Sequence, residues 1–192
     1  MRIKLAFFAI ATVLAANVAQ GDTSKAAVCV ACHGIDGNSI NPVWPNLAGQ
    51  GAEYTVQQLK AFKTKTRNNA VMWPFANSLS DDDMWQIAIY YSKQKLSVKP
   101  SSNSASETAE KLYRGGDMNR HIPACMACHG PNGAGNAPAR YPALRGQQAA
   151  YTQSQLLAYK SGERKHPMME AIAQNLSDND IKTLSSYISA LY

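Results

Sequence analysis

The sequence predicts an all-α protein made of two tandem copies of one small domain. The first observation is an internal repeat: WPNLAGQGAEYTVQQLKAFKTKTRNNAVM ends at Met72, and YPALRGQQAAYTQSQLLAYKSGERKHPMM ends at Met169. The second is that apolar residues recur at the helical interval in both copies, whereas no alternating strand pattern is present. Two copies of one unit indicate two similar domains rather than a long solenoid.

The first element, residues 1–21, is expected to be a signal peptide. Arg2 and Lys4 precede an apolar run that ends near Ala16, and small residues follow, which is the order of a secretory signal. The apolar run is shorter than the roughly 20 residues of a membrane span. An A-x-G site ending at Gly21 is a plausible cleavage point. An uncleaved anchor is the alternative, but the pattern favours a soluble, exported mature protein.

Charge narrows the choice of partners. The formal net charge is +6, and removal of Arg2 and Lys4 leaves +4, which is mildly basic. No run of like charge exceeds the three aspartates at 81–83. Nucleic acid is therefore not an expected partner, whereas an acidic protein patch or anionic lipid could meet a basic face.

The next elements are a first domain at residues 22–98 and a second at 107–192. In each, a helical stretch is expected at 52–63 and 149–160, with Tyr151, Leu156 and Tyr159 at helical spacing. A serine followed by acidic residues then predicts a capped helix start, at Ser80 and at Ser177. The helices that follow should bury an apolar stripe: Met84, Ile87 and Tyr91 in the first, and Ile181, Leu184, Ile188 and Leu191 in the second.

A linker is expected at residues 99–106. The stretch KPSSNSASE is rich in serine and lacks aromatic and large aliphatic residues. Domains of about 80 residues bury little core and usually need a covalent or metal staple.

The strongest chemical signal is C-x-x-C-H, which occurs as CVACHG from Cys29 and as CMACHG from Cys125. These motifs use all four cysteines, Cys29, Cys32, Cys125 and Cys128. C-x-x-C-H is the attachment signature of haem c, in which the two thiols form thioethers with the haem vinyl groups. The adjacent histidines, His33 and His129, would then reach the iron. The sequence thus predicts two covalently attached haem c groups.

Two rival interpretations use the same cysteines. A zinc site would need both motifs to converge, and it leaves the histidine after each pair unexplained. A C-x-x-C redox couple would need a βαβ context that the sequence lacks. Both are disfavoured.

The repeat nominates the second iron ligand in each domain. Met72 and Met169 occupy matching positions, because the offset between copies is 97 residues from Pro45 onward. Met168 competes with Met169, but its counterpart is Val71, which cannot bind iron. Histidine and methionine together fill both axial positions, raise the potential and leave no vacant site for oxygen or peroxide. The predicted task is the transfer of single electrons.

Other methionines and histidines lack a counterpart in the other copy. Packing is expected for Met84, Met118 and Met126, and a surface position for His121 and His166.

These motifs together resemble the cytochrome c4 family. The resemblance covers nearly all of the mature chain and is carried by YRGGDMNRHIPACMACHGPNGAGN, the LAGQ and LRGQ segments, RNNAVM and RKHPMM, and the two LSD helix starts. It implies two class I cytochrome c domains related by a pseudo-twofold axis. It also implies periplasmic electron transfer from a respiratory donor complex toward a terminal oxidase, with loose association to the inner membrane. Backbone carbonyls of Pro45 and Pro142 would accept hydrogen bonds from His33 and His129.

A second function remains open. A dihaem chain of this build could instead be the electron-accepting subunit of a dehydrogenase such as a flavocytochrome sulfide dehydrogenase. A dihaem peroxidase is disfavoured, because it needs an open iron site and the sequence offers a methionine in both copies. The chain is therefore expected to be an electron-transfer protein and not an enzyme.

Overall fold

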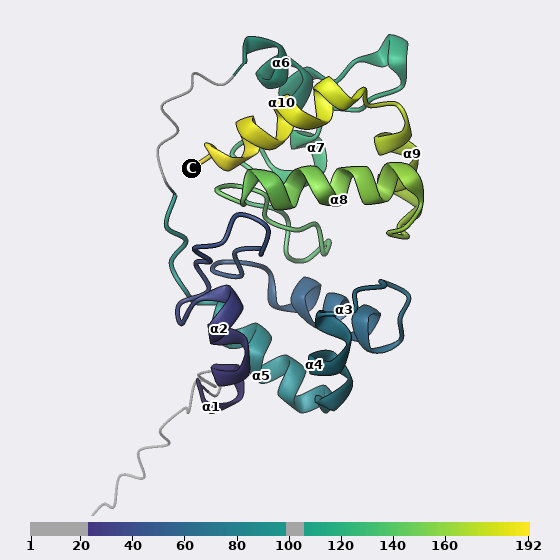
Figure 1. The fold of residues 1–192 in the computed structure, drawn as a ribbon. Coiled ribbons are helices and arrows are strands. Elements are labelled where there is room, and N and C mark those ends of the chain that lie inside the picture. The colour runs from purple at the N-terminus through teal and green to yellow at the C-terminus, as the bar shows by residue number, and fades with distance from the viewer. Residues whose placement is uncertain (1–22, 99–105) are drawn as a thin grey trace, which may run out of the picture.

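The computed structural model describes residues 23–98 and 106–192 (Figure 1). The predicted signal peptide lies outside these residues, as does the predicted linker apart from Ser106. Within the described ranges the regular structure is helical, with only isolated backbone bridges and no strand. The all-α prediction is confirmed.

The first domain forms the lower half of Figure 1. Its described residues contain six helical segments. In chain order they are α1 (Thr23–Ala26), η1 (Ala27–Cys29), α2 (Val30–His33), α3 (Ala52–Lys63), α4 (Met72–Ser78) and α5 (Asp81–Ser92). Helix α3 packs against both α4 and α5, and α1 packs against α5.

The second domain lies above it in Figure 1 and has a similar order of helices. Its elements are α6 (Glu107–Gly115), η2 (Met118–Arg120), α7 (Met126–His129), α8 (Ala149–Ser161), α9 (Pro167–Gln174) and α10 (Asp178–Ser189). Helix α8 packs against α9 and α10, and α6 packs against α10.

The last helix of each domain begins as the sequence predicts. Ser80 and Ser177 each accept a hydrogen bond from the backbone of the third helical residue, Asp83 or Asp180. Each aspartate in turn accepts one from the backbone of its serine, which completes a capping box. These caps fix where α5 and α10 start and therefore which face turns inward.

The predicted apolar stripes form the core of each domain. In the first domain the buried residues of α5 are Met84, Ile87, Ala88 and Tyr91. In the second domain, Ile181, Leu184, Ile188 and Leu191 join the core around Tyr113 and Ile122. In α8, Tyr159 is buried, whereas Tyr151 and Leu156 are half-buried.

The two domains meet through polar contacts, one of which joins residues that align in the repeat. Arg67 and Arg164 form an antiparallel backbone bridge. The Tyr151 backbone N–H donates to the Pro42 carbonyl at 3.2 Å, and Arg140 pairs with Glu53 at 3.0 Å. Among the helices of the described ranges, none is long and apolar enough to cross a membrane.

Candidate functional site

Each C-x-x-C-H motif lies on a short helix that places its cysteines and histidine together. Cys32 and His33 lie on α2, directly after Cys29 at the end of η1. In the second domain Cys125 precedes α7, which carries Cys128 and His129. All four cysteines are half-buried, and no disulfide joins them. Each domain therefore holds one complete motif.

A glycine ends each motif helix because the chain turns sharply there. Gly34 has φ +81° and Gly130 has φ +83°, a region that residues with a side chain seldom adopt. A Cβ at Gly34 would also lie 2.5 Å from the Asn38 carbonyl oxygen. This turn brings the chain back toward the histidine.

The two histidines are buried and oriented alike. His33 Nδ1 donates to the Pro45 carbonyl at 2.9 Å, and His129 Nδ1 donates to the Pro142 carbonyl at 3.0 Å. The bonds expected from the family resemblance are thus confirmed. Burial lowers the pKa of both rings, which keeps them neutral. The Nε2 atom of each ring then carries the lone pair that is available to a metal.

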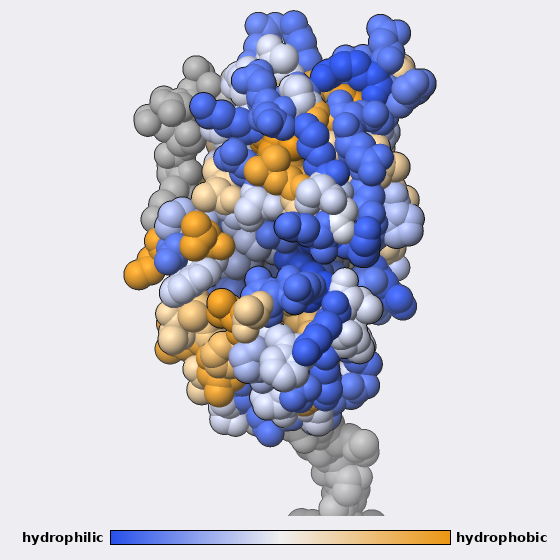
Figure 2. Space-filling model, turned by 45° about the vertical axis from the view of Figure 1, so that its right-hand side comes forward, coloured by the Kyte–Doolittle hydropathy of each residue, from blue (hydrophilic) through white to orange (hydrophobic). Residues whose placement is uncertain are grey.

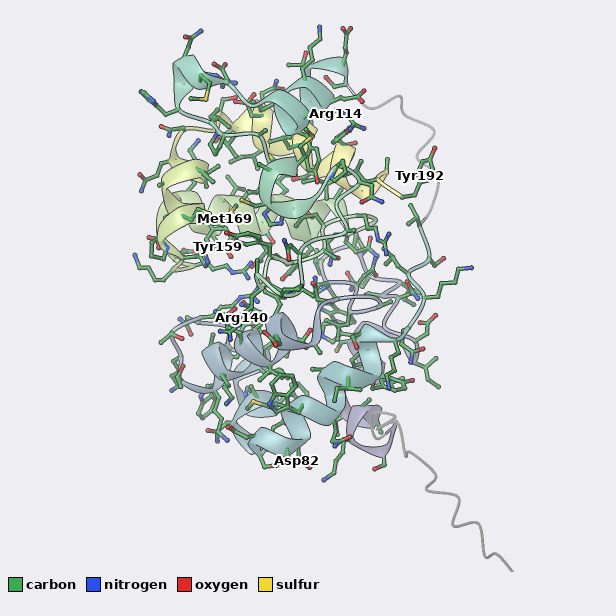
Figure 3. All side chains as sticks on the ribbon, turned by 180° about the vertical axis from the view of Figure 1, so that it is seen from behind. Asp82, Arg114, Arg140, Tyr159, Met169 and Tyr192 are labelled. Carbon is green, nitrogen blue, oxygen red and sulfur yellow. The ribbon has the colours of Figure 1, made fainter. Side chains whose placement is uncertain are left out.

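The candidate methionines begin the next helix of each domain. Met72 is the first residue of α4, where Asn69 Oδ1 accepts a hydrogen bond from its backbone N–H at 2.8 Å. Met169 lies in the first turn of α9, where His166 Nδ1 accepts from its backbone N–H at 3.4 Å. Figure 3 labels Met169 on α9 and Tyr159 on α8, two helices that pack together.

Burial separates the two competing methionines of the second domain. Met168 is 44% exposed, and its counterpart Val71 is 59% exposed. Met72 and Met169 are both half-buried, and Met72 packs against the core of its domain. Side-chain exposure therefore follows the repeat register, which favours Met169.

The remaining methionines and histidines have other positions. Met84 is fully buried in the core and Met126 packs against the core of the second domain. Met118 is 77% exposed, so the expectation that it packs inside is wrong. His121 is exposed, as expected. His166 is also exposed, and its side chain caps α9. It aligns in the repeat with Asn69, a residue type that often caps helices, and this alignment was the signal for its role.

The structure keeps the two cysteine pairs apart. In the described ranges no group of three or more histidine, cysteine, aspartate or glutamate side chains is placed to hold a metal ion. Burial raises the pKa of Cys29 to about 11, with a further contribution from neighbouring Cys32. Burial also raises the pKa of Cys125 to about 11. The four cysteines therefore do not form the single cluster that the zinc interpretation requires.

A pair of arginines at the domain interface suits a ligand that brings its own negative charge. Arg164 is buried and Arg67 half-buried, and within the described residues no carboxylate lies at ion-pair distance from either guanidinium. Buried charges are normally paired. Haem carries propionate carboxylates, so these arginines fit its charge. Sequence reasoning aligned the two arginines but gave them no role.

Each domain thus combines a C-x-x-C-H helix, a buried histidine with one free ring nitrogen, and a half-buried methionine on a separate helix. A fold and a site of this kind define a dihaem c-type cytochrome, an electron-transfer protein and not an enzyme. The cytochrome c family model matches residues 18–95 and 107–191.

The curated relatives and solved structures are more specific. Cytochrome c4 from Stutzerimonas stutzeri is 42% identical and covers 93% of this chain and 91% of that protein. A crystal structure of reduced recombinant cytochrome c4 from Pseudomonas stutzeri matches with a TM-score of 0.85 at 43% identity, over 88% of this chain and 96% of the other. The chain belongs to the cytochrome c4 family, and it binds two haem c groups, one at each C-x-x-C-H motif.

One further relative is named as the electron acceptor of a dehydrogenase. A thiosulfate dehydrogenase electron acceptor from Thiomonas intermedia is 39% identical and covers 86% of this chain and 79% of that protein.

Proposed function

We propose that this protein is a periplasmic carrier that takes single electrons from a respiratory donor complex and delivers them toward a terminal oxidase. Its ligands would be Cys29 and Cys32 with His33 and Met72 in the first domain. The matching set in the second domain would be Cys125, Cys128, His129 and Met169. The cysteines would hold each haem through thioethers, and the histidine and methionine would bind its iron, which supplies the one-electron chemistry.

The observation that carries this proposal is the repetition of one complete donor set in two domains that contact each other. Both histidines are held in one orientation by a proline carbonyl, and both are neutral because they are buried. Haem iron supplies the one-electron chemistry when it is bound. The protein's part is to hold a neutral imidazole and a thioether in place, so that little rearrangement accompanies a change of charge.

The two domains present different surfaces to partners. Figure 2 shows a face on which hydrophilic residues predominate and hydrophobic residues gather in patches, one of them on the first domain below. Around the first motif, Val28, Ile35 and Ile40 are 58%, 71% and 94% exposed. Their counterparts are Ala124, Pro131 and Asn136. This difference supports separate contact sites for donor and acceptor, as a carrier requires.

The proposed location rests on the sequence, and the proposed direction rests on the resemblance to the cytochrome c4 family. The predicted signal peptide supports export, and the mild positive charge supports loose contact with an anionic membrane surface.

The test is to mix the reduced holoprotein with membranes that contain a terminal oxidase and follow oxidation of both haems. We expect rapid, complete oxidation that an oxidase inhibitor blocks. Oxidation unaffected by the inhibitor would contradict the proposed direction.

The relative named as a thiosulfate dehydrogenase electron acceptor favours a second candidate. In this function the protein accepts electrons directly from a dehydrogenase. That enzyme would be a thiosulfate dehydrogenase or a flavocytochrome sulfide dehydrogenase. Purification from native membranes and soluble fractions separates the two. A carrier elutes alone, whereas a dehydrogenase subunit elutes with its catalytic partner.

A further inference from the structure

The peptide that follows each histidine's proline is held by the other domain. The Pro45 carbonyl accepts from His33, and the N–H of the same peptide group belongs to Asn46. That N–H donates to Gln147 Oε1 at 2.8 Å, across the domain interface. Gln147 Nε2 donates back to the Asn46 carbonyl at 2.9 Å. One glutamine of the second domain thus binds both sides of the residue next to Pro45.

The reverse contact is present on the other side of the interface. The Pro142 carbonyl accepts from His129, and the N–H of that peptide group, on Ala143, donates to Gln50 Oε1 at 2.9 Å. Gln50 Nε2 donates to the Ala143 carbonyl at 3.0 Å. Gln50 and Gln147 align in the repeat, and each is only 9% exposed.

Both glutamines are held ready for this contact by their own domains. The Oε1 atom of Gln50 also accepts from the Gly51 backbone at 3.0 Å, and that of Gln147 from the Gln148 backbone at 2.9 Å. These bonds fix which end of each amide points at the neighbouring domain: the oxygen faces the peptide N–H.

The bonding pattern has an electronic consequence. A peptide group whose N–H donates a hydrogen bond becomes more polarised, so its carbonyl becomes a better acceptor. A better acceptor at Pro45 draws the Nδ1 proton of His33 more strongly and makes the imidazole more basic. A more basic ligand stabilises ferric iron and lowers the reduction potential.

We propose that Gln147 tunes the potential of the haem in the first domain, and Gln50 that of the haem in the second. Each is a positioning residue that acts on the iron ligand of the opposite domain through one peptide group. This inference rests on the proposed ligation by His33 and His129. It makes the domain interface part of each iron's environment as well as a structural contact.

The test uses the holoprotein with both haems bound and replaces Gln147 with methionine, which keeps the side-chain length and removes both hydrogen-bonding atoms. We expect the potential of the first-domain haem, followed by its own methyl resonances in a redox titration, to rise. The ring N–H resonance of His33 in the reduced protein should move upfield, as a weaker hydrogen bond requires. The potential of the second-domain haem and the ring resonance of His129 should be unchanged. In Gln50→Met the second-domain haem and His129 should change, and the first-domain haem and His33 should not.

Two further variants separate this effect from loosening of the interface. Gln148 Nε2 also crosses the interface, donating to the Ser39 carbonyl at 2.7 Å, but it does not touch the Pro45–Asn46 peptide. Gln148→Met should therefore leave both potentials and both ring resonances in place. Gln147→Glu keeps an acceptor for the Asn46 N–H and loses only the donor, so the first potential should not rise.

The outcomes are distinct. The proposal is overturned if Gln147→Met shifts neither potential, shifts both equally, or shifts only the haem of its own domain. A rise in Gln147→Glu or Gln148→Met equal to that in Gln147→Met would also overturn it. If the spectra of the wild-type protein lack a hydrogen-bonded ring N–H resonance for the histidine at each haem, the proposed ligands are wrong instead.

Discussion

Arg67 and Arg164 face each other across the domain interface, and each guanidinium binds both domains. Arg67 donates to Gln58 of its own domain and to Tyr151 and Gln155 of the other. Arg164 donates to Gln155 of its own domain and to Tyr54 and Gln58 of the other. Gln58 Oε1 and Gln155 Oε1 each accept from both arginines, so the four side chains form one closed network.

This network predicts the effect of removing one charge. Arg164→Gln should destabilise the protein by about 2–3 kcal/mol, because it breaks charged hydrogen bonds in a buried site. It should also lower both potentials, since a nearby positive charge disfavours ferric iron. Thermal unfolding and redox titration measure the two effects. Arg140→Gln is the control: its pair with Glu53 is exposed, and its loss should cost no more than about 0.5 kcal/mol.

Haem attachment can be counted directly. The wild-type holoprotein should exceed the mass of its polypeptide by two haem groups, because both motifs are complete. The double variant Cys125→Ala, Cys128→Ala should retain one haem covalently, in the first domain. A wild-type mass that shows one haem, or zinc in place of haem, contradicts the assignment.

The methionine ligands can be tested one domain at a time. Met169→Ala should remove about half of the weak near-infrared band that arises from sulfur bound to ferric haem and should lower one potential, because a softer ligand that favours ferrous iron is lost. Met72→Ala should do the same for the other haem. Met168→Ala is the matched control and should change neither property. Damage by Met168→Ala alone would mean that the repeat register is wrong.

Ionised Asp180 should contribute to the stability of the second domain at neutral pH, and this contribution should be lost in acid. Burial alone would raise its pKa, but hydrogen bonds from Arg120 and Ser177 together hold the pKa below its ordinary value. A depressed carboxyl pKa contributes stability above the unfolded pKa, and that stability is lost as the pH falls through the folded value. Asp180→Asn should therefore cost about 1–2 kcal/mol at neutral pH and much less near pH ~2.

Chemical denaturation at the two pH values measures this difference. Asp82→Asn, at an exposed position on α5 (Figure 3), should change stability little at either pH. An Asp180→Asn penalty that is the same at both pH values would show that the charge is not its source.

Electron exchange between the haems should be fast, because the interface holds the domains together and the chain tethers them. After partial reduction with less than one electron per protein, stopped-flow spectra should show redistribution at a rate that does not depend on protein concentration. A rate that rises with concentration would show that electrons move between molecules instead.

Sequence alone predicted helices α3, α5, α8 and α10, their capping serines where present and the buried stripes of α5 and α10, because these depend on local spacing. It also placed the candidate ligands, because the repeat aligned them. The contacts of Gln50, Gln147, Arg67 and Arg164 could not be predicted in the same way. Their alignment was visible, but a polar residue that is repeated looks the same whether it faces solvent or another domain.

The expectation for Met118 was wrong, and the role of His166 was incomplete. Met118 was expected to pack inside and is exposed, because a methionine's environment depends on the tertiary fold and not on its residue type. His166 lies at the surface, as expected, and its side chain also caps α9. Caps other than serine, threonine, asparagine and aspartate carry a weaker sequence signal.

The exchange of glutamines between the domains has a consequence for how a protein of this kind could arise. Gln50 reaches the second domain as Gln147 reaches the first, which is the reciprocity of an isologous dimer, where one surface meets a copy of itself. A single-domain ancestor with one such glutamine and one such arginine would already satisfy both halves of the contact. Gene duplication would then have needed no new interface. It would have turned an association that depends on protein concentration into one that does not.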